Sequence, residues 1–280
     1  MQVLRYAAFT ADPAGGNPAG VVLDAAGAAD ADMLAVAAEV GFSETAFVTG
    51  RDAAGRLEVR YFSPLAEVPF CGHATIATGV ALAERDGPGA VTLVTRAGVV
   101  EVSTRRGRDG ATSATLVSVP PRTRPLPDDV LGDLLAALRW RVDELDPALP
   151  PRVAYAGAHH PVLAAATRRR LAELDYDWTA LQALMARHDW TTVDLVWRES
   201  PTVFHARNPF PPGGVVEDPA TGAAAAALGG YLRELGLLPV PATVTVHQGD
   251  DLGRPGVLTV DIGADPAAGI AVTGAAVRMP

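Results

Sequence analysis

Two stretches of the chain, P-F-C-G-H-A-T-I-A-T-G (residues 69–79) and V-E-D-P-A-T-G-A-A-A-A-A-L-G-G-Y-L (residues 216–232), are its most informative segments. Each is a junction that begins as a loop and continues into small residues with the character of a helix. We call residues 69–79 the first junction and residues 216–232 the second junction. Small side chains at a helix start leave the free N–H groups of the first turn open to an anion such as a carboxylate. A purely structural role stays open, because small residues also let a buried helix pack tightly.

The N-terminal half, which includes the first junction, is predicted to form strands around a helix. That helix is expected at residues 73–85. A second helix should begin at Asp30, which can act as an N-cap, and end at Gly41. Alternating or continuous apolar runs predict the strands. They cover residues 3–9, 19–23, 45–48, 57–62, 91–95, 99–104 and 113–119.

A proline-rich stretch, P-P-R-T-R-P-L-P (residues 120–127), holds four prolines in eight positions and predicts a linker. We therefore expect two domains, residues 1–120 and residues 121–280, and the last strand could pair with the first domain. The second half repeats the plan of the first loosely. Its helices are expected at residues 129–140, 178–188 and 223–235, and its strands at residues 153–156, 193–197, 202–206, 243–248, 257–262 and 270–278.

Each half therefore shows strands, a loop ending in small residues, a helix and more strands. This pattern predicts an α+β fold of two pseudo-duplicated domains, since strands cluster instead of alternating with helices. Two short segments receive purely structural predictions. Residues 168–170, R-R-R, are expected to be a solvated helix face, and residues 159–161, H-H-P, a loop.

Composition and charge argue against several classes of function. The 280 residues carry a net charge of −9, and no basic stripe with interleaved aromatic residues supports binding to nucleic acid. No signal peptide is expected, and the most apolar stretch, residues 223–232, is too short to span a bilayer. The single cysteine, Cys71, rules out an intrachain disulfide. A soluble cytoplasmic protein without membrane or nucleic-acid partners is therefore expected.

Glu44 is the first candidate for chemistry, within G-F-S-E-T-A-F-V at residues 41–48. The apolar neighbours Phe42, Ala46 and Phe47 predict surroundings that disfavour charge, so the pKa of this carboxyl group should rise. A carboxyl group of that kind can give and take a proton near neutral pH. The alternative is a structural residue that hydrogen-bonds exposed backbone amides.

Two further candidates lie at the junctions. His73 is at the start of the first small-residue helix, where a capping or core role is the alternative. Asp218 can equally start a turn, with Thr221 as a helix cap, and Glu217 offers a second carboxylate. None of the remaining histidines has the spacing of a metal site, so no metal is expected. Motifs for phosphate binding, dinucleotide binding and serine hydrolysis are absent.

Taken together, five ordered motifs resemble those of the PhzF-like phenazine-biosynthesis family, which has the diaminopimelate-epimerase fold. The resemblance covers nearly the whole chain, and the order of the motifs makes it specific. It implies two domains, each a curved, mostly antiparallel sheet wrapped around a central helix. The motifs are F-T-A-D-P-A-G-G-N-P-A-G-V-V-L (residues 9–23), S-E-T-A-F-V (43–48), R-Y-F-S-P-L-A-E-V-P-F-C-G-H-A-T (60–75), E-D-P-A-T-G (217–222) and Q-G-D-D-L-G-R-P (248–255).

The resemblance also implies an activity. The family's founding enzyme isomerises trans-2,3-dihydro-3-hydroxyanthranilate by proton transfer and needs no metal or organic cofactor. Glu44 falls on the family's general acid/base, His73 on its active-site histidine and Asp218 on its active-site aspartate. The resemblance therefore implies a cofactor-independent isomerase that moves a proton on a small cyclic amino or hydroxy acid. It also implies a homodimer.

The substrate is expected to be a small carboxylic acid. Its carboxylate should bind backbone amides around Gly72 and around Gly222 and Ala223, with Asn17 and Ser43 as further binding residues. At Ala223 the chain departs from the family, which usually has a serine that touches the substrate. The missing hydroxyl donor could cost about 1–3 kcal/mol of binding, so the substrate need not be the phenazine precursor.

Two alternatives stay open. The first is an epimerase-like or racemase-like enzyme of specialised metabolism. Related racemases use two cysteines, so a chain with Cys71 alone would need Glu44 and another group instead. The second is a non-catalytic homologue that binds a small acid. Ala223 mildly favours it, whereas the retained Glu44, His73 and Asp218 argue against it.

Overall fold

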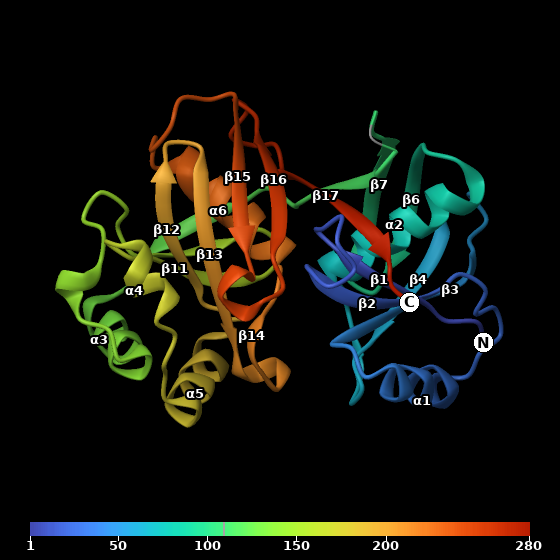
Figure 1. The fold of residues 1–280 in the computed structure, drawn as a ribbon, viewed down its shortest axis with the longest axis horizontal. Coiled ribbons are helices and arrows are strands. Elements are labelled where there is room, and N and C mark those ends of the chain that lie inside the picture. The colour runs from blue at the N-terminus through green and yellow to red at the C-terminus, as the bar shows by residue number, and fades with distance from the viewer. Residues whose placement is uncertain (109) are drawn as a thin grey trace. The chain divides into compact units, whose positions relative to one another are not determined.

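Strands dominate the computed structural model, which describes residues 1–108 and 110–280 (Figure 1). The chain divides into two units, one formed by Met1–Val117 with Thr273–Pro280 and the other by Ser118–Val272. The predicted mixed α+β character is confirmed. Within the described residues, every helix is too short or too polar to cross a membrane.

In the first unit, the sheet register places two candidate residues close to one another. Asn17 begins β2 and pairs with Ala8 of β1, while Glu44 begins β3, which runs parallel to β2 with Glu44 opposite Ala19. Asn17 and Glu44 therefore lie at the same end of neighbouring strands. The elements of this unit are β1 (Leu4–Ala8), β2 (Asn17–Val22), α1 (Asp30–Val40), β3 (Glu44–Arg51), β4 (Leu57–Phe62), β5 (Glu67–Val68), α2 (Gly72–Asp86), β6 (Ala90–Thr95), β7 (Gly98–Arg106), β8 (Thr112–Val117) and most of β17 (Ala271–Arg278).

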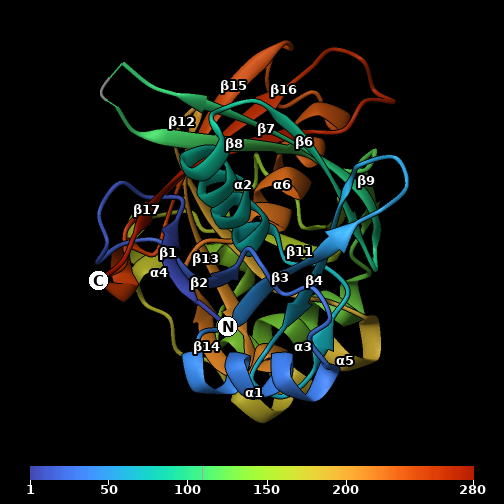
Figure 2. The same ribbon diagram turned by 90° about the vertical axis from the view of Figure 1, so that its right-hand side faces the viewer.

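Helix α2 is the buried helix of this unit, and Figure 2 shows it against the strands. Residues 73–83 are all buried, and the helix contacts β1, β2, β3, β7 and β8. Gly79 permits this approach, because a Cβ there would lie 2.8 Å from Val102 Cγ1 and 3.2 Å from Ala114 Cβ. The small residues after the first junction therefore have a packing role.

The second unit has a comparable buried helix, α6, which contacts β9, β10, β11 and β16. Parallel pairs join β11 to β12 and β13 to β15, and the other strand pairs are antiparallel. The elements are β9 (Arg122–Pro125), α3 (Asp128–Leu138), η1 (Val142–Glu144), β10 (Arg152–Tyr155), β11 (His159–Ala164), α4 (Arg168–Ala172), α5 (Trp178–His188), β12 (Asp194–Ser200), β13 (Val203–Phe210), η2 (Pro211–Gly213), β14 (Val215–Asp218), α6 (Gly222–Glu234), β15 (Ala242–Gln248), η3 (Asp250–Leu252) and β16 (Gly256–Ile262).

Three local predictions were wrong. Residues 159–161 begin β11 instead of forming a loop, and Ala154 of β10 pairs with His160. Part of the proline-rich segment is strand β9, which pairs with β10 and ends at Pro125, as an edge strand can. Asp30 is the first residue of α1 and not its N-cap, and its carboxylate bonds Arg60 at 2.6 Å.

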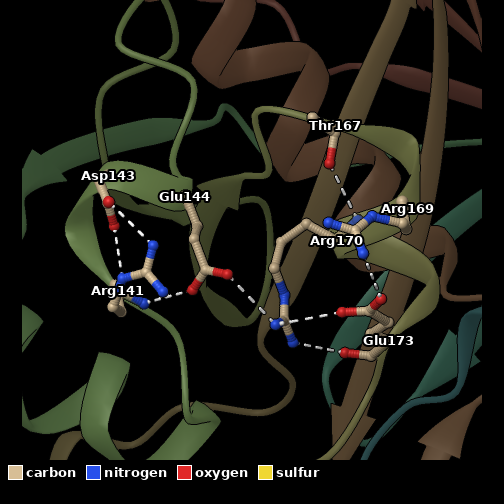
Figure 3. A network of polar contacts seen from close by, with 7 residues as sticks. All are labelled: Arg141, Asp143, Glu144, Thr167, Arg169, Arg170 and Glu173. Atoms are coloured by element: carbon tan, nitrogen blue, oxygen red, sulfur yellow. Dashed lines mark hydrogen bonds and ion pairs between the residues drawn. The ribbon is translucent and has the colours of Figure 1, made fainter.

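The arginine run begins α4, but its members differ in exposure. The side chain of Arg169 is 86% exposed, as a solvated face requires. That of Arg170 is 16% exposed and reaches Glu144 Oε1 at 3.4 Å and the backbone oxygen of Glu173 at 2.7 Å (Figure 3). The predicted solvated face is therefore right for Arg169 and wrong for Arg170.

A buried polar cluster links β11, β12 and β13 of the second unit. Asn208 Nδ2 donates to Asp194 Oδ1 at 3.2 Å, Thr192 Oγ1 donates to Asn208 Oδ1 at 2.6 Å, and His160 Nδ1 contacts Thr192 Oγ1 at 2.8 Å. Burial raises the pKa of Asp194 from 3.8 to about 7, and burial lowers the pKa of His160 to about 3. His160 is therefore neutral above about pH 3, and Asp194 is neutral below about pH 7.

The raised pKa of Asp194 makes the stability of the folded chain depend on pH. Its pKa is higher in the folded chain than in the unfolded chain, so folding takes up a proton between about pH 4 and 7. Stability is lost as pH rises through that window. We expect the free energy of unfolding of Asp194→Asn, measured with urea, to increase relative to that of the wild type as pH rises from 4 to 8. The increase should be at most about 4 kcal/mol. Asp24→Asn, an exposed control, should show no such gain, and an equal difference at both pH values would contradict the burial argument.

Candidate active site

An ion pair links β4 to β5, the short strand that precedes α2. Arg60 of β4 donates from Nε to Glu67 Oε1 at 2.8 Å and from Nη2 to Glu67 Oε2 at 2.7 Å. Glu67 belongs to β5, which pairs antiparallel with β4 and leads into the first junction. The two parallel hydrogen bonds of such a fork fix orientation as well as distance. The short strand ahead of the first junction is thereby held against β4.

Glu44, Cys71 and His73 form a cluster at the start of α2. Glu44 Oε2 lies 3.4 Å from His73 Nε2 and accepts from the Cys71 thiol at 3.5 Å. The Cys71 sulfur lies 3.4 Å from His73 Nδ1 and 3.7 Å from His73 Nε2. Cys71 occupies the N-cap position of α2, but its side chain does not cap the helix. A carboxyl group, a thiol and an imidazole therefore share one small region.

Two further polar side chains lie beside this cluster. Asn17 Nδ2 lies 3.1 Å from His73 Nδ1, and Ser43 Oγ lies 3.4 Å from His73 Nε2. Asn17 and His73 are buried, so the imidazole has little water around it. The structure therefore brings together four predicted residues, Glu44, His73, Asn17 and Ser43, and Gly72 begins the adjoining helix.

The surroundings of Glu44 alter its protonation. Desolvation raises the pKa of its carboxyl group above the ordinary value of 4.5, while hydrogen bonds from Ser43 and Cys71 lower it in part. Burial is the larger effect, so the net shift is upward. The predicted direction of the pKa shift of Glu44 is thus confirmed.

The remaining predicted site residues lie in the second unit. Arg207 of β13 and Glu217 of β14 form a buried ion pair, with Nε to Oε2 at 2.9 Å, on antiparallel strands that lead into the second junction. Glu217 is therefore engaged as a structural partner of Arg207. The adjacent Asp218 accepts from Thr221 Oγ1 at 2.6 Å, so the threonine hydroxyl orients Asp218 and does not cap the helix.

Gln248 organises the second junction, although its motif suggested no role for it. Its Nε2 donates to the backbone oxygen of Asp218 at 2.7 Å and to Thr221 Oγ1 at 2.9 Å. Its Oε1 accepts from the Thr221 backbone N–H at 3.0 Å. Gln248 thereby fixes the loop ahead of Gly222 and Ala223, which begin α6. The position of this glutamine at the end of a predicted strand is the only sequence signal of its role.

The expectation about metals needs one qualification. The sequence shows no conventional ligand spacing, and yet one ligand atom each from Glu44, Cys71 and His73 all lie within 4.8 Å of one another. The carboxylate comes from β3, far from the C-G-H motif in sequence. Local spacing could not have shown this combination.

Comparisons with known proteins cover almost the whole chain. The family model for phenazine biosynthesis-like protein, PhzC-PhzF, matches residues 6–279. An uncharacterized isomerase, YddE, of Escherichia coli O157:H7 is 33% identical over 99% of this chain and 95% of its own length. The trans-2,3-dihydro-3-hydroxyanthranilate isomerase of Pseudomonas chlororaphis is 30% identical over 90% of this chain and 86% of its own.

Solved structures resemble the whole chain. A PhzF-family phenazine biosynthesis protein from Bacillus anthracis superposes with a TM-score of 0.89 at 26% identity, covering 100% of this chain and 98% of that one. A predicted epimerase from Pseudomonas aeruginosa gives 0.85 at 26% identity, over 99% and 96%. A probable proline racemase from Agrobacterium radiobacter gives 0.68 at 15% identity, over 99% and 90%, and shows a shared fold alone.

The hydrogen bond from Ser43 makes the protonation of Glu44 testable. Because this bond favours the carboxylate, Ser43→Ala should raise the pKa of Glu44 further. Titration of the side-chain carboxyl carbon by NMR, assigned through loss of the signal in Glu44→Gln, measures this shift directly. Ser103→Ala in β7 is the matched control and should leave the titration unchanged. A downward shift in Ser43→Ala would show that the hydroxyl does not stabilise the charged form.

Proposed function

Because the chain belongs to the phenazine biosynthesis-like PhzC-PhzF family, we propose that it is an isomerase that moves a proton on a small cyclic amino or hydroxy acid. The observation that carries the proposal is Glu44, a poorly hydrated carboxyl group with a raised pKa in contact with an imidazole. The named isomerases among its relatives support the reaction class.

In this proposal Glu44 is the general acid/base. As a carboxylate it takes a proton from an activated ring carbon, and as a carboxylic acid it returns that proton to another carbon. The raised pKa brings its two protonation states closer in free energy near neutral pH, which suits a group that must pass through both. The imidazole of His73, held by Asn17, positions the carboxyl group and can bond a polar group of the substrate.

The substrate is proposed to bind through its carboxylate and its other polar groups. Gly72 begins α2 and Gly222 begins α6, and free amides at helix N-termini favour anions. Asp218, oriented by Thr221, is proposed to bond an amino or hydroxyl group. Ala223 offers no hydroxyl, so the proposal names a class of substrate and not the anthranilate derivative itself.

An epimerase is the second candidate, supported by the similarity to the predicted epimerase from P. aeruginosa. The Cys71 thiol, in contact with Glu44, is a second group that carries a proton. The two activities differ in their products. In deuterated water, exchange at Cα with loss of optical rotation indicates an epimerase, whereas a shifted double bond indicates the proposed isomerase.

Removal of the acid/base tests the proposal. We expect Glu44→Gln to slow solvent deuterium incorporation into the substrate about 10²- to 10⁴-fold, because the amide cannot carry the proton. A panel of cyclic amino acids and dihydro-aromatic acids serves to find the substrate. Glu39→Gln, on the neighbouring helix α1, applies the same substitution outside the cluster and should keep wild-type rates.

The result separates the possible roles of Glu44. Near-native exchange in a folded Glu44→Gln variant would remove Glu44 as the base. Tight binding of an acid by the wild type without any exchange would instead favour the non-catalytic alternative.

A further inference from the structure

The Glu44, Cys71 and His73 cluster has the chemistry of a metal site as well as that of a proton-transfer site. Thiolate, imidazole and carboxylate are the three side-chain ligands that Zn²⁺ uses in proteins. Sites with three protein ligands leave a fourth position for water or a small molecule. Here one ligand atom of each kind comes within 4.8 Å of the others.

The separations between these atoms match one face of a tetrahedron around zinc. With Zn–N and Zn–O bonds of about 2.0–2.1 Å and a Zn–S bond of about 2.3 Å, tetrahedral ligands lie about 3.3–3.6 Å apart. The observed distances are 3.4 Å from Glu44 Oε2 to His73 Nε2, 3.5 Å from Cys71 Sγ to Glu44 Oε2, and 3.7 Å from Cys71 Sγ to His73 Nε2. Little movement is needed for all three atoms to reach one ion.

The surroundings also suit a ligating histidine. When His73 binds an ion through Nε2, its Nδ1–H needs an acceptor, and metal-bound histidines commonly find one in a neighbouring oxygen. The side-chain amide of Asn17 lies 3.1 Å from Nδ1 and can turn its oxygen towards it. Cys71 and His73 are buried, which limits competition from water.

We propose that Glu44, Cys71 and His73 form a binding site for a thiophilic divalent cation, Zn²⁺ by preference, and that the bound ion inhibits the enzyme. Binding forms a zinc–sulfur bond and releases the thiol proton of Cys71 to solvent. Mg²⁺ and Ca²⁺, which prefer sets of oxygen ligands, do not compete at this site. The inhibitory role rests on the proposed function of Glu44: the ion occupies Glu44 Oε2, so proton transfer by Glu44 and metal binding exclude one another.

Metal binding can be measured without any substrate. Tag-free protein is titrated with Co²⁺ as a spectroscopic substitute for Zn²⁺, and then with Zn²⁺. We expect one ion per chain, the ligand-field bands of tetrahedral cobalt and a thiolate-to-cobalt charge-transfer band. Because Cys71 is the only cysteine of the chain, that last band can arise from no other residue. Zn²⁺ should displace the cobalt, and Mg²⁺ should not.

Variants assign the ligands. Cys71→Ser and Cys71→Ala should abolish the charge-transfer band, and His73→Asn should weaken Zn²⁺ binding more than about 100-fold, since loss of an outer partner alone costs 10–100-fold. Asn17→Ala, which removes an outer partner of His73, should weaken Zn²⁺ binding about 10- to 100-fold. His188→Asn, at the end of α5, is the control and should bind as the wild type does. Thermal unfolding with and without Zn²⁺ reports that each variant is folded and whether the ion stabilises it.

The proposal and the isomerase assignment fail separately. Absence of a tight 1:1 site, or a site that persists in folded Cys71→Ser, would overturn the metal proposal whatever the activity. If a substrate is found, Zn²⁺ should suppress its deuterium exchange in the wild type, and a chelator should restore it. Exchange that persists with the site fully occupied by Zn²⁺ would overturn the inhibitory role.

Discussion

An arginine–glutamate ion pair precedes each buried small-residue helix, and each pair ties the short strand ahead of that helix to a longer strand. Arg60 and Glu67 precede α2, and Arg207 and Glu217 precede α6. In both cases the arginine lies on a longer strand and the glutamate on a short antiparallel strand next to it. Removing one partner of a buried pair such as Arg207–Glu217 commonly costs about 3–5 kcal/mol, because the other charge is left uncompensated. The Arg60–Glu67 pair is only partly buried. Each pair holds the short strand that leads into the helix against its longer neighbour.

Strand register explains why residues distant in sequence meet so closely. The register of β1, β2 and β3 places Asn17 and Glu44 beside the start of α2. In the second unit Gln248, from the end of β15, binds both Asp218 and Thr221. Short side chains at the helix starts then leave room for polar groups. Burial raises the pKa of Glu44, and the hydrogen bonds from Ser43 and Cys71 reduce that rise.

Much of the fold could be predicted from local patterns. The predicted strand at residues 57–62 and helix at residues 178–188 match β4 and α5, because alternation and helical periodicity are strong there. Prediction failed where tertiary pairing overrides local preference. Prolines suggested a linker where β9 pairs with β10, and two histidines before a proline suggested a loop where β11 begins. The motifs named Glu44 and His73 as candidates, but neither the contact of Cys71 with Glu44 nor the bonds of Gln248 can be deduced from spacing alone.

The path of the last strand has a consequence for the order of folding during synthesis. β17 pairs with β1 and β8, Phe9 N–H donates to Ala275 O at 2.7 Å, and Thr115 bonds Thr273. These partners leave the ribosome long before residues 273–278 do. The second unit, a continuous segment, can finish folding while the first still lacks a strand beside β1. The first unit, which holds Glu44 and His73, is therefore completed last, and truncation near its C-terminal strand exposes an unpaired sheet edge.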